Sequence, residues 1–246
     1  MLLLHYLRSI FHSNIFKKIL FYELNTIITN VLSQCFMGLG LLRKIKNYSQ
    51  ILNKKYENEE FWKKFGVEYY DKYKNKKEWV KKQEILLVEH LKTLEFNSVL
   101  EFGCGFGRTA KILSENFSIQ KFNAFDLSSH QIENAKKYCE GLNIKFMSSS
   151  IKDFETNEKF DLVFGPEILM HIEPKDIEFV IKKMTSFTNK YFMVSILPYK
   201  NQKIHRGTHT FYHDYEKIYE KIGLPKPLII PVDEINAIHI IDIQNQ

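Results

Sequence analysis

The chain has 246 residues, a formal net charge of +6 at pH 7 and 44% hydrophobic residues. This length accommodates one α/β domain of about 170 residues with an N-terminal extension, and such a domain buries a core without disulfide or metal support. Three scattered cysteines without Cys-x-x-Cys spacing argue against a metal site and favour a reducing, cytoplasmic setting. Only four of the 35 basic residues are arginine, so the positive charge gives little support to a nucleic-acid partner.

The N-terminal segment is uncharged from Leu24 to Leu42, and Arg43, Lys44 and Lys46 follow. Apolar residues spaced three and four apart within it predict one stripe of an amphipathic helix. Such a helix packs over the main domain or, through residues 24–46, touches a membrane surface. The charged stretch over 48–58 predicts a boundary, with a helical extension over 1–58 and the main domain over 59–246.

Residues 98–108 form the most informative stretch, Ser-Val-Leu-Glu-Phe-Gly-Cys-Gly-Phe-Gly-Arg. An apolar strand turns sharply there into a helix that we expect to begin near Phe106, and glycines at alternate positions allow close approach of a ligand to the backbone. The dinucleotide fingerprint would place a glycine where Arg108 stands. The carboxylate of Glu101 would repel a pyrophosphate but pair with an ammonium group. The stretch therefore favours a nucleoside cofactor that carries an ammonium group and no phosphate.

Strands and helices alternate after this turn. A strand over 120–127 ends at Asp126, about 20 residues past the glycines, where a Rossmann-like fold places the acid that receives ribose hydroxyls. Ser128 is expected to cap a helix that runs to about Cys139. The remaining expected elements are strands over 144–149, 160–164, 191–197, 228–232 and 237–243, and helices from Pro174 to about Thr188 and from Tyr215 to Ile222. This order predicts an α/β doubly wound, mostly parallel sheet with a terminal antiparallel hairpin.

The Glu-x-Gly-x-Gly-x-Gly run resembles motif I of the class I S-adenosylmethionine-dependent methyltransferases. The resemblance implies a Rossmann-like fold, S-adenosylmethionine as cofactor and an enzyme that transfers its methyl group to a small molecule. Relatives carry an acid that accepts from the adenine amino group where Ser150 stands; the serine oxygen, or the backbone at Ser150 or Ile151, can read adenine instead. The cofactor-binding residues implied are Glu101, Gly103, Gly105, Gly107, Arg108, Asp126, Ser150, Ile151 and Gly165.

A second pattern resembles methylases associated with pseudaminic acid biosynthesis, and it comprises residues 61–70, 163–172, 205–207 and 211–215. It implies a nucleotide-linked or acidic sugar as acceptor. Two alternatives stay open: a membrane-associated lipid or quinone methyltransferase, which the N-terminal stripe would serve, and a non-catalytic Rossmann-like binding module.

A hydroxyl acceptor requires a base. The candidate bases on the expected acceptor side are Glu167, His171, His205, His209 and His213, with His171 serving either catalysis or packing. His205, His209 and His213 are spaced four apart, but Gly207 and the β-branched threonines beside it favour a loop over a helix, so no metal site is expected. Arg206 in the same loop is available to hold a carboxylate or phosphate of the acceptor.

Overall fold

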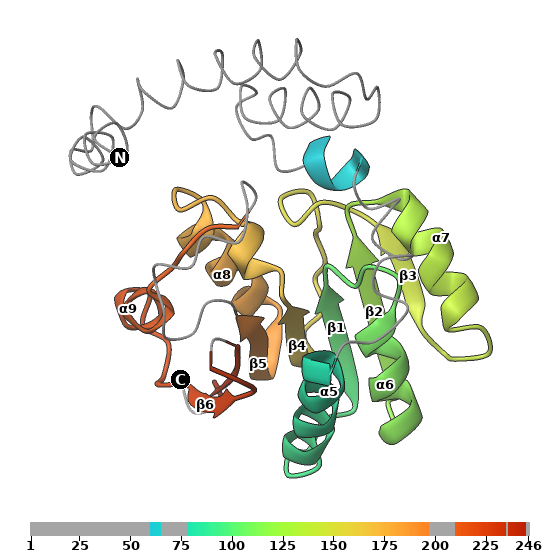
Figure 1. The fold of residues 1–246 in the computed structure, drawn as a ribbon, viewed down its shortest axis with the longest axis horizontal. Helices are drawn as coiled ribbons and strands as arrows, with labels where there is room; N and C mark the ends of the chain where they lie inside the picture. The colour runs from blue at the N-terminus through green and yellow to red at the C-terminus, as the bar shows by residue number, and fades with distance from the viewer. Residues whose placement is uncertain (1–59, 65–77, 197–209, 235, 245–246) are drawn as a thin grey trace, which may run out of the picture. The chain divides into compact units, whose positions relative to one another are not determined.

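The computed structural model describes residues 60–64, 78–196, 210–234 and 236–244 (Figure 1). The predicted extension over 1–58, with its apolar stripe, lies outside the described residues, and so do His205, Arg206 and His209. The boundary near residue 58 therefore stays a prediction.

The described chain forms one seven-stranded sheet in the order β3-β2-β1-β4-β5-β7-β6. The neighbours from β3 through β5 are parallel, whereas β7 runs antiparallel to both β5 and β6. The predicted mostly parallel sheet with a terminal antiparallel hairpin is thus confirmed. The strands are β1 (Ser98–Phe102), β2 (Lys121–Asp126), β3 (Lys145–Ser148), β4 (Phe160–Pro166), β5 (Thr188–Ile196), β6 (Leu228–Pro231) and β7 (Ala237–Asp242).

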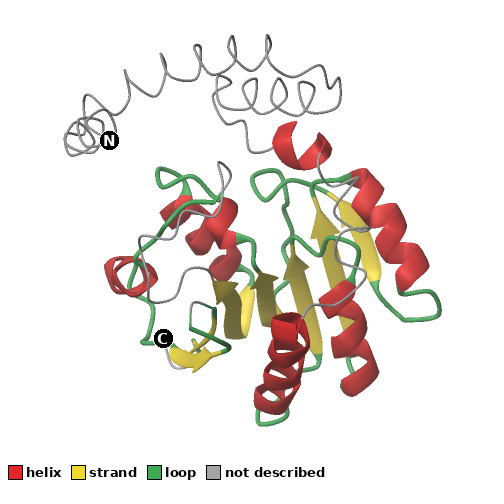
Figure 2. Cartoon of the chain, viewed as in Figure 1, coloured by secondary structure: helices red, strands yellow, loops and turns green. Residues whose placement is uncertain are grey.

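Helices cover both faces of the sheet (Figure 2). Side chains alternate between the faces along β1: Val99 packs with residues of α5 (Glu78–Leu91), α6 (Arg108–Asn116) and α7 (Ser129–Tyr138), whereas Leu100 packs with residues of α8 (Ile177–Ser186) and α9 (Tyr215–Lys221). Because successive strand residues point to opposite faces, Glu101 falls on the same face as Val99, the face that α5 and α6 cover.

Two helix boundaries differ from the prediction. Helix α6 begins at Arg108 rather than near Phe106, because Gly107 precedes it with φ 85°, a left-handed conformation outside the helical region. Helix α8 spans Ile177–Ser186 instead of running from Pro174 to Thr188. Thr188 already belongs to β5, where it pairs with Phe160, so strand pairing overrides the local helical pattern. The predicted cap of α7 is confirmed, since the Ser128 side chain accepts from the Gln131 amide.

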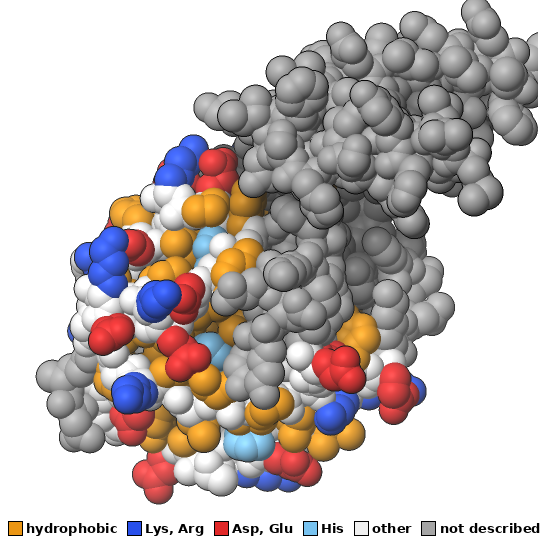
Figure 3. All heavy atoms as spheres, turned by 60° about the vertical axis from the view of Figure 1, so that its left-hand side comes forward, with side chains coloured by type: hydrophobic (Ala, Val, Ile, Leu, Met, Phe, Trp, Pro, Cys, Tyr) orange, Lys and Arg blue, Asp and Glu red, His pale blue; other side chains and the backbone are white. Residues whose placement is uncertain are grey.

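Figure 3 brings the α8 and α9 side of the described chain forward, and acidic and basic side chains are interspersed there. Several form ion pairs, such as Lys152 with Asp176 at 3.3 Å and Lys217 with Asp214 at 2.9 Å. Exposed pairs of this kind contribute little to stability. Because acidic and basic side chains are interspersed, the electrostatic potential of this face has no single sign.

Candidate cofactor and acceptor site

The glycine turn after β1 contains three residues with left-handed φ: Gly103 at 68°, Gly105 at 54° and Gly107 at 85°. A Cβ on Gly103 would lie 2.5 Å from Cδ1 of Ile168, and one on Gly107 would lie 2.8 Å from Sγ of Cys139. A Cβ on Gly105 would meet nothing within 4 Å. Two of the glycines thus permit close protein packing, and Gly105 leaves its backbone open to a ligand.

Asp126 ends β2 beside this turn and holds it. Its Oδ2 accepts from the Gly105 amide at 2.9 Å, and its Oδ1 accepts from the Ser128 amide at 2.9 Å. Burial raises the pKa of Asp126, and the amides of Ser128 and Gly105 oppose that rise. The predicted ribose acid therefore sits in the turn with both oxygens already hydrogen-bonded, each with acceptor capacity left for a hydroxyl.

Glu101 is fully buried on β1 under α6. Its Oε1 accepts from the Thr109 hydroxyl at 2.5 Å, and its Oε2 has no hydrogen-bond partner among the described residues. Burial raises the pKa of this carboxyl to about 7, against the opposing effects of the Thr109 hydrogen bond and of Arg108. A buried carboxylate oxygen without a partner is costly. A cationic ligand group would satisfy it.

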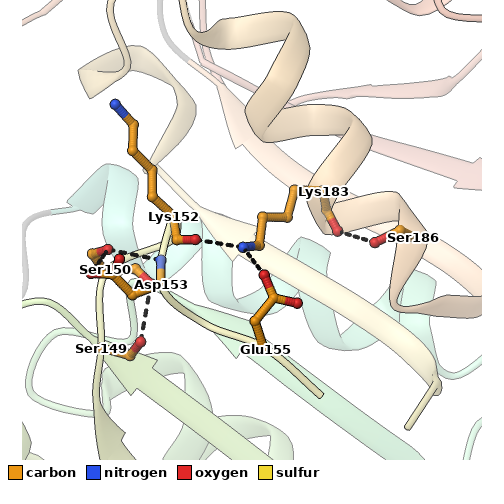
Figure 4. A network of polar contacts seen from close by, with 7 residues as sticks. All are labelled: Ser149, Ser150, Lys152, Asp153, Glu155, Lys183 and Ser186. Atoms are coloured by element: carbon orange, nitrogen blue, oxygen red, sulfur yellow. Dashed lines mark hydrogen bonds and ion pairs between the residues drawn. The ribbon is translucent and has the colours of Figure 1, made fainter. Parts of the chain in front are cut away.

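The β3 end carries Ser150 and a residue that sequence reasoning missed, Asp153 (Figure 4). The Ser150 hydroxyl donates to Oδ2 of Asp153 at 2.7 Å and accepts from the Asp153 amide at 3.1 Å. Because the Ser150 hydroxyl already donates its hydrogen bond to Asp153, the Ser150 oxygen can only accept a further hydrogen bond. Ile151 follows it and packs, half-buried, against the core.

Lys183 of α8 binds the segment that follows β3 (Figure 4). Its ammonium donates to the Lys152 carbonyl at 2.6 Å and to Oε1 of Glu155 at 2.7 Å. The connection that follows β3 is thereby tied to α8, whose buried residues share one core cluster with Phe154.

The end of β4 presents Glu167 in an unusual backbone conformation. Its φ is 58°, and no other non-glycine residue of the described chain has a positive φ. Its amide donates to the Ser195 carbonyl of β5 at 3.1 Å, and its Oε1 accepts from Nε2 of Gln83 at 3.0 Å. Strained residues of this kind cluster at functional sites.

Gln83 was not among the sequence candidates, although the sequence holds a signal for it. The buried residues of α5 are Val80, Gln83, Leu87 and Leu91, so Gln83 is a polar residue within an apolar stripe. A buried amide there needs partners. Arg108 provides one, since its Nη2 donates to Oε1 of Gln83 at 3.1 Å, and its Nη1 pairs with Glu84 at 3.1 Å.

Gly165 lies within β4, and neighbouring side chains pack closely against its Cα. A Cβ there would lie 2.7 Å from Cε of Met184 and 2.9 Å from Cγ2 of Ile168. The absence of a side chain is thus explained by packing, and the role of Gly165 in cofactor binding stays a prediction.

The two histidines predicted near the acceptor have different surroundings. His171, in the short helix η1 (Leu169–His171), contacts the Trp62 ring at a centroid distance of 4.5 Å. His213 is buried, and its Nε2 lies 3.0 Å from the Ile172 carbonyl oxygen, which can only accept, so this nitrogen donates. Burial lowers the pKa of His213. His213 thus ties its loop to the segment after η1.

The loop that carries His213 lies beside η1 in its described part, because the Phe211 amide donates to the Met170 carbonyl at 2.7 Å. The segment after β4 and the described part of the segment after β5 therefore approach each other. Among the described residues, no group of histidine, cysteine and acidic side chains could hold a metal ion. In that same part of the chain, no helix is long and apolar enough to cross a membrane.

Comparisons with known proteins fit this geometry. Residues 99–190 match a family described as "Methyltransferase domain". The chain is 29% identical over 105 residues to (S)-coclaurine N-methyltransferase of Papaver somniferum, covering 42% of this chain and 29% of that protein. It is 30% identical over 117 residues to malonyl-[acyl-carrier protein] O-methyltransferase 1 of Ilyobacter polytropus, covering 47% and 42%. The chain thus spans less than half the length of these curated relatives.

Solved structures share the fold at low sequence identity. The N-methyltransferase NodS of Bradyrhizobium japonicum, in complex with S-adenosyl-L-homocysteine, matches with a TM-score of 0.61 and 16% identity, over 76% of this chain and 98% of that one. Magnesium protoporphyrin IX methyltransferase of Synechocystis, with bound SAH, matches with a TM-score of 0.60 and 15% identity, over 75% and 96%. Residues 99–190 of this chain match the methyltransferase-domain family, and the sheet that contains them has the same fold as these solved methyltransferases.

Proposed function

We propose that this protein is an S-adenosylmethionine-dependent methyltransferase that acts on a small-molecule acceptor. The proposal rests on two features that lie side by side in the chain, the buried Glu101 carboxylate and the glycine turn that follows it. A fully buried carboxylate oxygen without a described partner lies on β1, and a backbone stretch that no side chain occupies follows at Gly105. An ammonium group beside a nucleoside matches this combination, whereas a pyrophosphate would be repelled.

The other residues around the turn suit the rest of that cofactor. Asp126 offers acceptor capacity for ribose hydroxyls, and Ser150 offers an acceptor for the adenine amino group, with the Ile151 backbone beside it. Gly103 and Gly107 keep the turn tight against Ile168 and Cys139. Similarity to methyltransferases that are solved with SAH supports the same cofactor here.

On the acceptor side we assign the base to Glu167. When bound, the cofactor would supply a methyl group on a positively charged sulfur. A lone pair of the acceptor forms a bond to this methyl group while the bond to sulfur breaks, and the sulfur becomes a neutral thioether. The protein must then orient the acceptor and receive its proton. Glu167 stands in a strained conformation at the end of β4, and His171 lies four residues further along. His213 donates to a buried carbonyl, which favours an anchoring role for it.

For the acceptor we propose a nucleotide-linked or acidic sugar, on the basis of the sequence pattern over 163–172 and 211–215. The described part of that pattern meets at one place, through the hydrogen bond from Phe211 to Met170. A quinone or lipid acceptor is the second candidate. It is supported by a match at 30% identity over 88 residues to ubiquinone biosynthesis O-methyltransferase of Rickettsia bellii, 35% of which is covered.

Calorimetry tests the cofactor. S-adenosylhomocysteine should bind the full chain, and Asp126→Ala should weaken binding by about 1–3 kcal/mol because ribose hydroxyls and turn amides lose their acceptor. NAD serves as the control ligand and should not compete. Tight binding of NAD without binding of S-adenosylhomocysteine would overturn the proposal. Transfer of labelled methyl from S-adenosylmethionine to panels of nucleotide-linked sugars, acidic sugars and quinones then identifies the acceptor class.

A further inference from the structure

A chain of polar contacts connects the start of α6 to the end of β4 through α5. Glu84 pairs with Nη1 of Arg108, Nη2 of Arg108 donates to Oε1 of Gln83, and Nε2 of Gln83 donates to Oε1 of Glu167. The three distances are 3.1, 3.1 and 3.0 Å. Gln83 is only 3% exposed, so these contacts are sheltered from water.

The chemistry of the two ends fixes the orientation of the Gln83 amide. A guanidinium only donates hydrogen bonds, so the Gln83 oxygen must face Arg108. The amide nitrogen is then left facing Glu167, and an ionised carboxylate only accepts. The Gln83 side chain therefore cannot flip without losing both contacts, and its donor stays directed at one oxygen of Glu167.

Glu167 is constrained from its backbone as well. Its left-handed φ of 58° is a strained conformation for a residue with a Cβ. The conformation is held by the amide of Glu167, which donates to Ser195 of the neighbouring strand. A side chain whose backbone is strained and whose carboxylate is hydrogen-bonded by a buried amide is fixed in position before any acceptor arrives.

We propose that Gln83, oriented by Arg108, is a positioning residue that fixes the location of the Glu167 carboxylate and leaves its Oε2 open to the acceptor. The inference rests on the proposed function, in which Glu167 receives the proton of the acceptor. Arg108 directly follows Gly107, so the glycine turn that we assign to the cofactor and the carboxylate that we assign to the acceptor are held by one polar chain. The Gln83 donor occupies Oε1, and the acceptor proton goes to Oε2 of Glu167.

The test uses Gln83→Met, which keeps the volume and removes the donor, and Gln83→Glu, which keeps a partner for Arg108 but places a second carboxylate beside Glu167. Glu84→Gln is the matched control, because it alters the other partner of Arg108 on the same helix and leaves the Gln83 amide unchanged. Nuclear magnetic resonance of protein labelled with ¹³C at glutamate carboxyl groups follows the chemical shift of the Glu167 carboxyl at constant pH, with Glu167→Gln assigning the signal.

The Glu167 carboxyl signal should move in both Gln83→Met and Gln83→Glu, because each substitution removes the amide that donates to Oε1 of Glu167. Glu84→Gln should leave it in place. With S-adenosylmethionine and a fixed mixture of nucleotide-linked and acidic sugars, Gln83→Met should lower methyl transfer about 10-fold or more while the affinity for S-adenosylhomocysteine changes less than twofold. Adding Gln83→Met to Glu167→Gln should cause no further loss.

An unchanged Glu167 carboxyl signal in both Gln83 variants would overturn the inference, whatever the acceptor is. So would full methyl transfer by Gln83→Met, or a loss of cofactor affinity and melting temperature in that variant without a change in the carboxyl signal, which is the signature of a packing role. If the unaltered chain binds no S-adenosylhomocysteine, the proposed function fails, and the carboxyl signal still decides whether Gln83 positions Glu167.

Discussion

The Asp126 carboxylate accepts a hydrogen bond from the Gly105 amide at 2.9 Å, so the acid at the end of β2 holds the glycine turn that follows β1. The two residues lie 21 positions apart in the chain and meet because β1 and β2 are parallel neighbours, with Phe102 paired to Phe125. A main-chain group and an acid that we assign to the cofactor are thereby fixed relative to each other.

Alanine substitutions at two glycines of the turn should separate cofactor affinity from stability. Gly105→Ala should cost about 1–2 kcal/mol of stability from its positive φ alone, since nothing lies within 4 Å of the new Cβ, but should weaken S-adenosylhomocysteine at least 10-fold. Gly107→Ala places a Cβ 2.8 Å from the Cys139 sulfur, so it should lose about 3 kcal/mol or more while the folded protein keeps its affinity. Urea unfolding and calorimetry measure the two quantities. Equal affinities in both variants would contradict the assignment of Gly105 to the ligand.

Cofactor binding should release a proton from Glu101. Burial raises the pKa of this carboxyl to about 7, so about half of the molecules carry the proton at pH 7, and pairing with an ammonium group drives it off. Calorimetry of S-adenosylhomocysteine at pH 7, in buffers with different ionisation enthalpies, should show a release of about half a proton that Glu101→Gln abolishes. Glu140→Gln, at an exposed position, is the control. Equal proton release in Glu101→Gln and the unaltered chain would place the ammonium elsewhere.

Two buried groups should give the ligand-free protein opposing pH dependences. Burial lowers the pKa of His239 from 6.5 to about 4, so its contribution to stability is present above pH 6.5 and is lost as the pH falls toward 4, on the order of 3 kcal/mol in total. The raised pKa of Glu101 acts in the other sense: stability is lost as the pH rises from 4.5 to about 7.

These contributions largely cancel in the unaltered chain, and single variants should separate them. His239→Phe should become more stable as the pH falls from 7 to 4.5, whereas Glu101→Gln should lose stability steeply between pH 6.5 and 4. Denaturant unfolding at several pH values measures both, with His130→Gln at an exposed position as the control. Parallel pH profiles for the two variants would show that neither group dominates.

The Asp153 contact changes what a carboxylate at position 150 should do. Ser150→Asp would bring two carboxylates together where a hydroxyl now donates to Asp153 at 2.7 Å, so cofactor affinity should fall. Adding Asp153→Asn relieves the repulsion, and the double variant should bind S-adenosylhomocysteine at least as well as the unaltered chain. Asp153→Asn alone is the control. Tighter binding by Ser150→Asp alone would show that Asp153 has no influence on the adenine subsite.

The order of strands and helices, the glycine turn and its acids could all be predicted from the sequence. Those features are local: the apolar run before Gly103, the capping serine at 128 and the alternation that places Glu101 opposite Leu100 all depend on neighbouring residues. The same holds for the terminal hairpin, whose two β-rich runs are close in the chain.

Tertiary structure alone decided which distant side chains meet. Gln83 and Glu167 are 84 positions apart, and their contact depends on how α5 packs across the end of β4. The left-handed backbone of Glu167 and the start of β5 at Thr188 are likewise imposed by pairing with a neighbouring strand. Hydrogen bonds and strain between segments that are remote in sequence leave no periodic pattern, because they arise only once the sheet has brought the strand ends together.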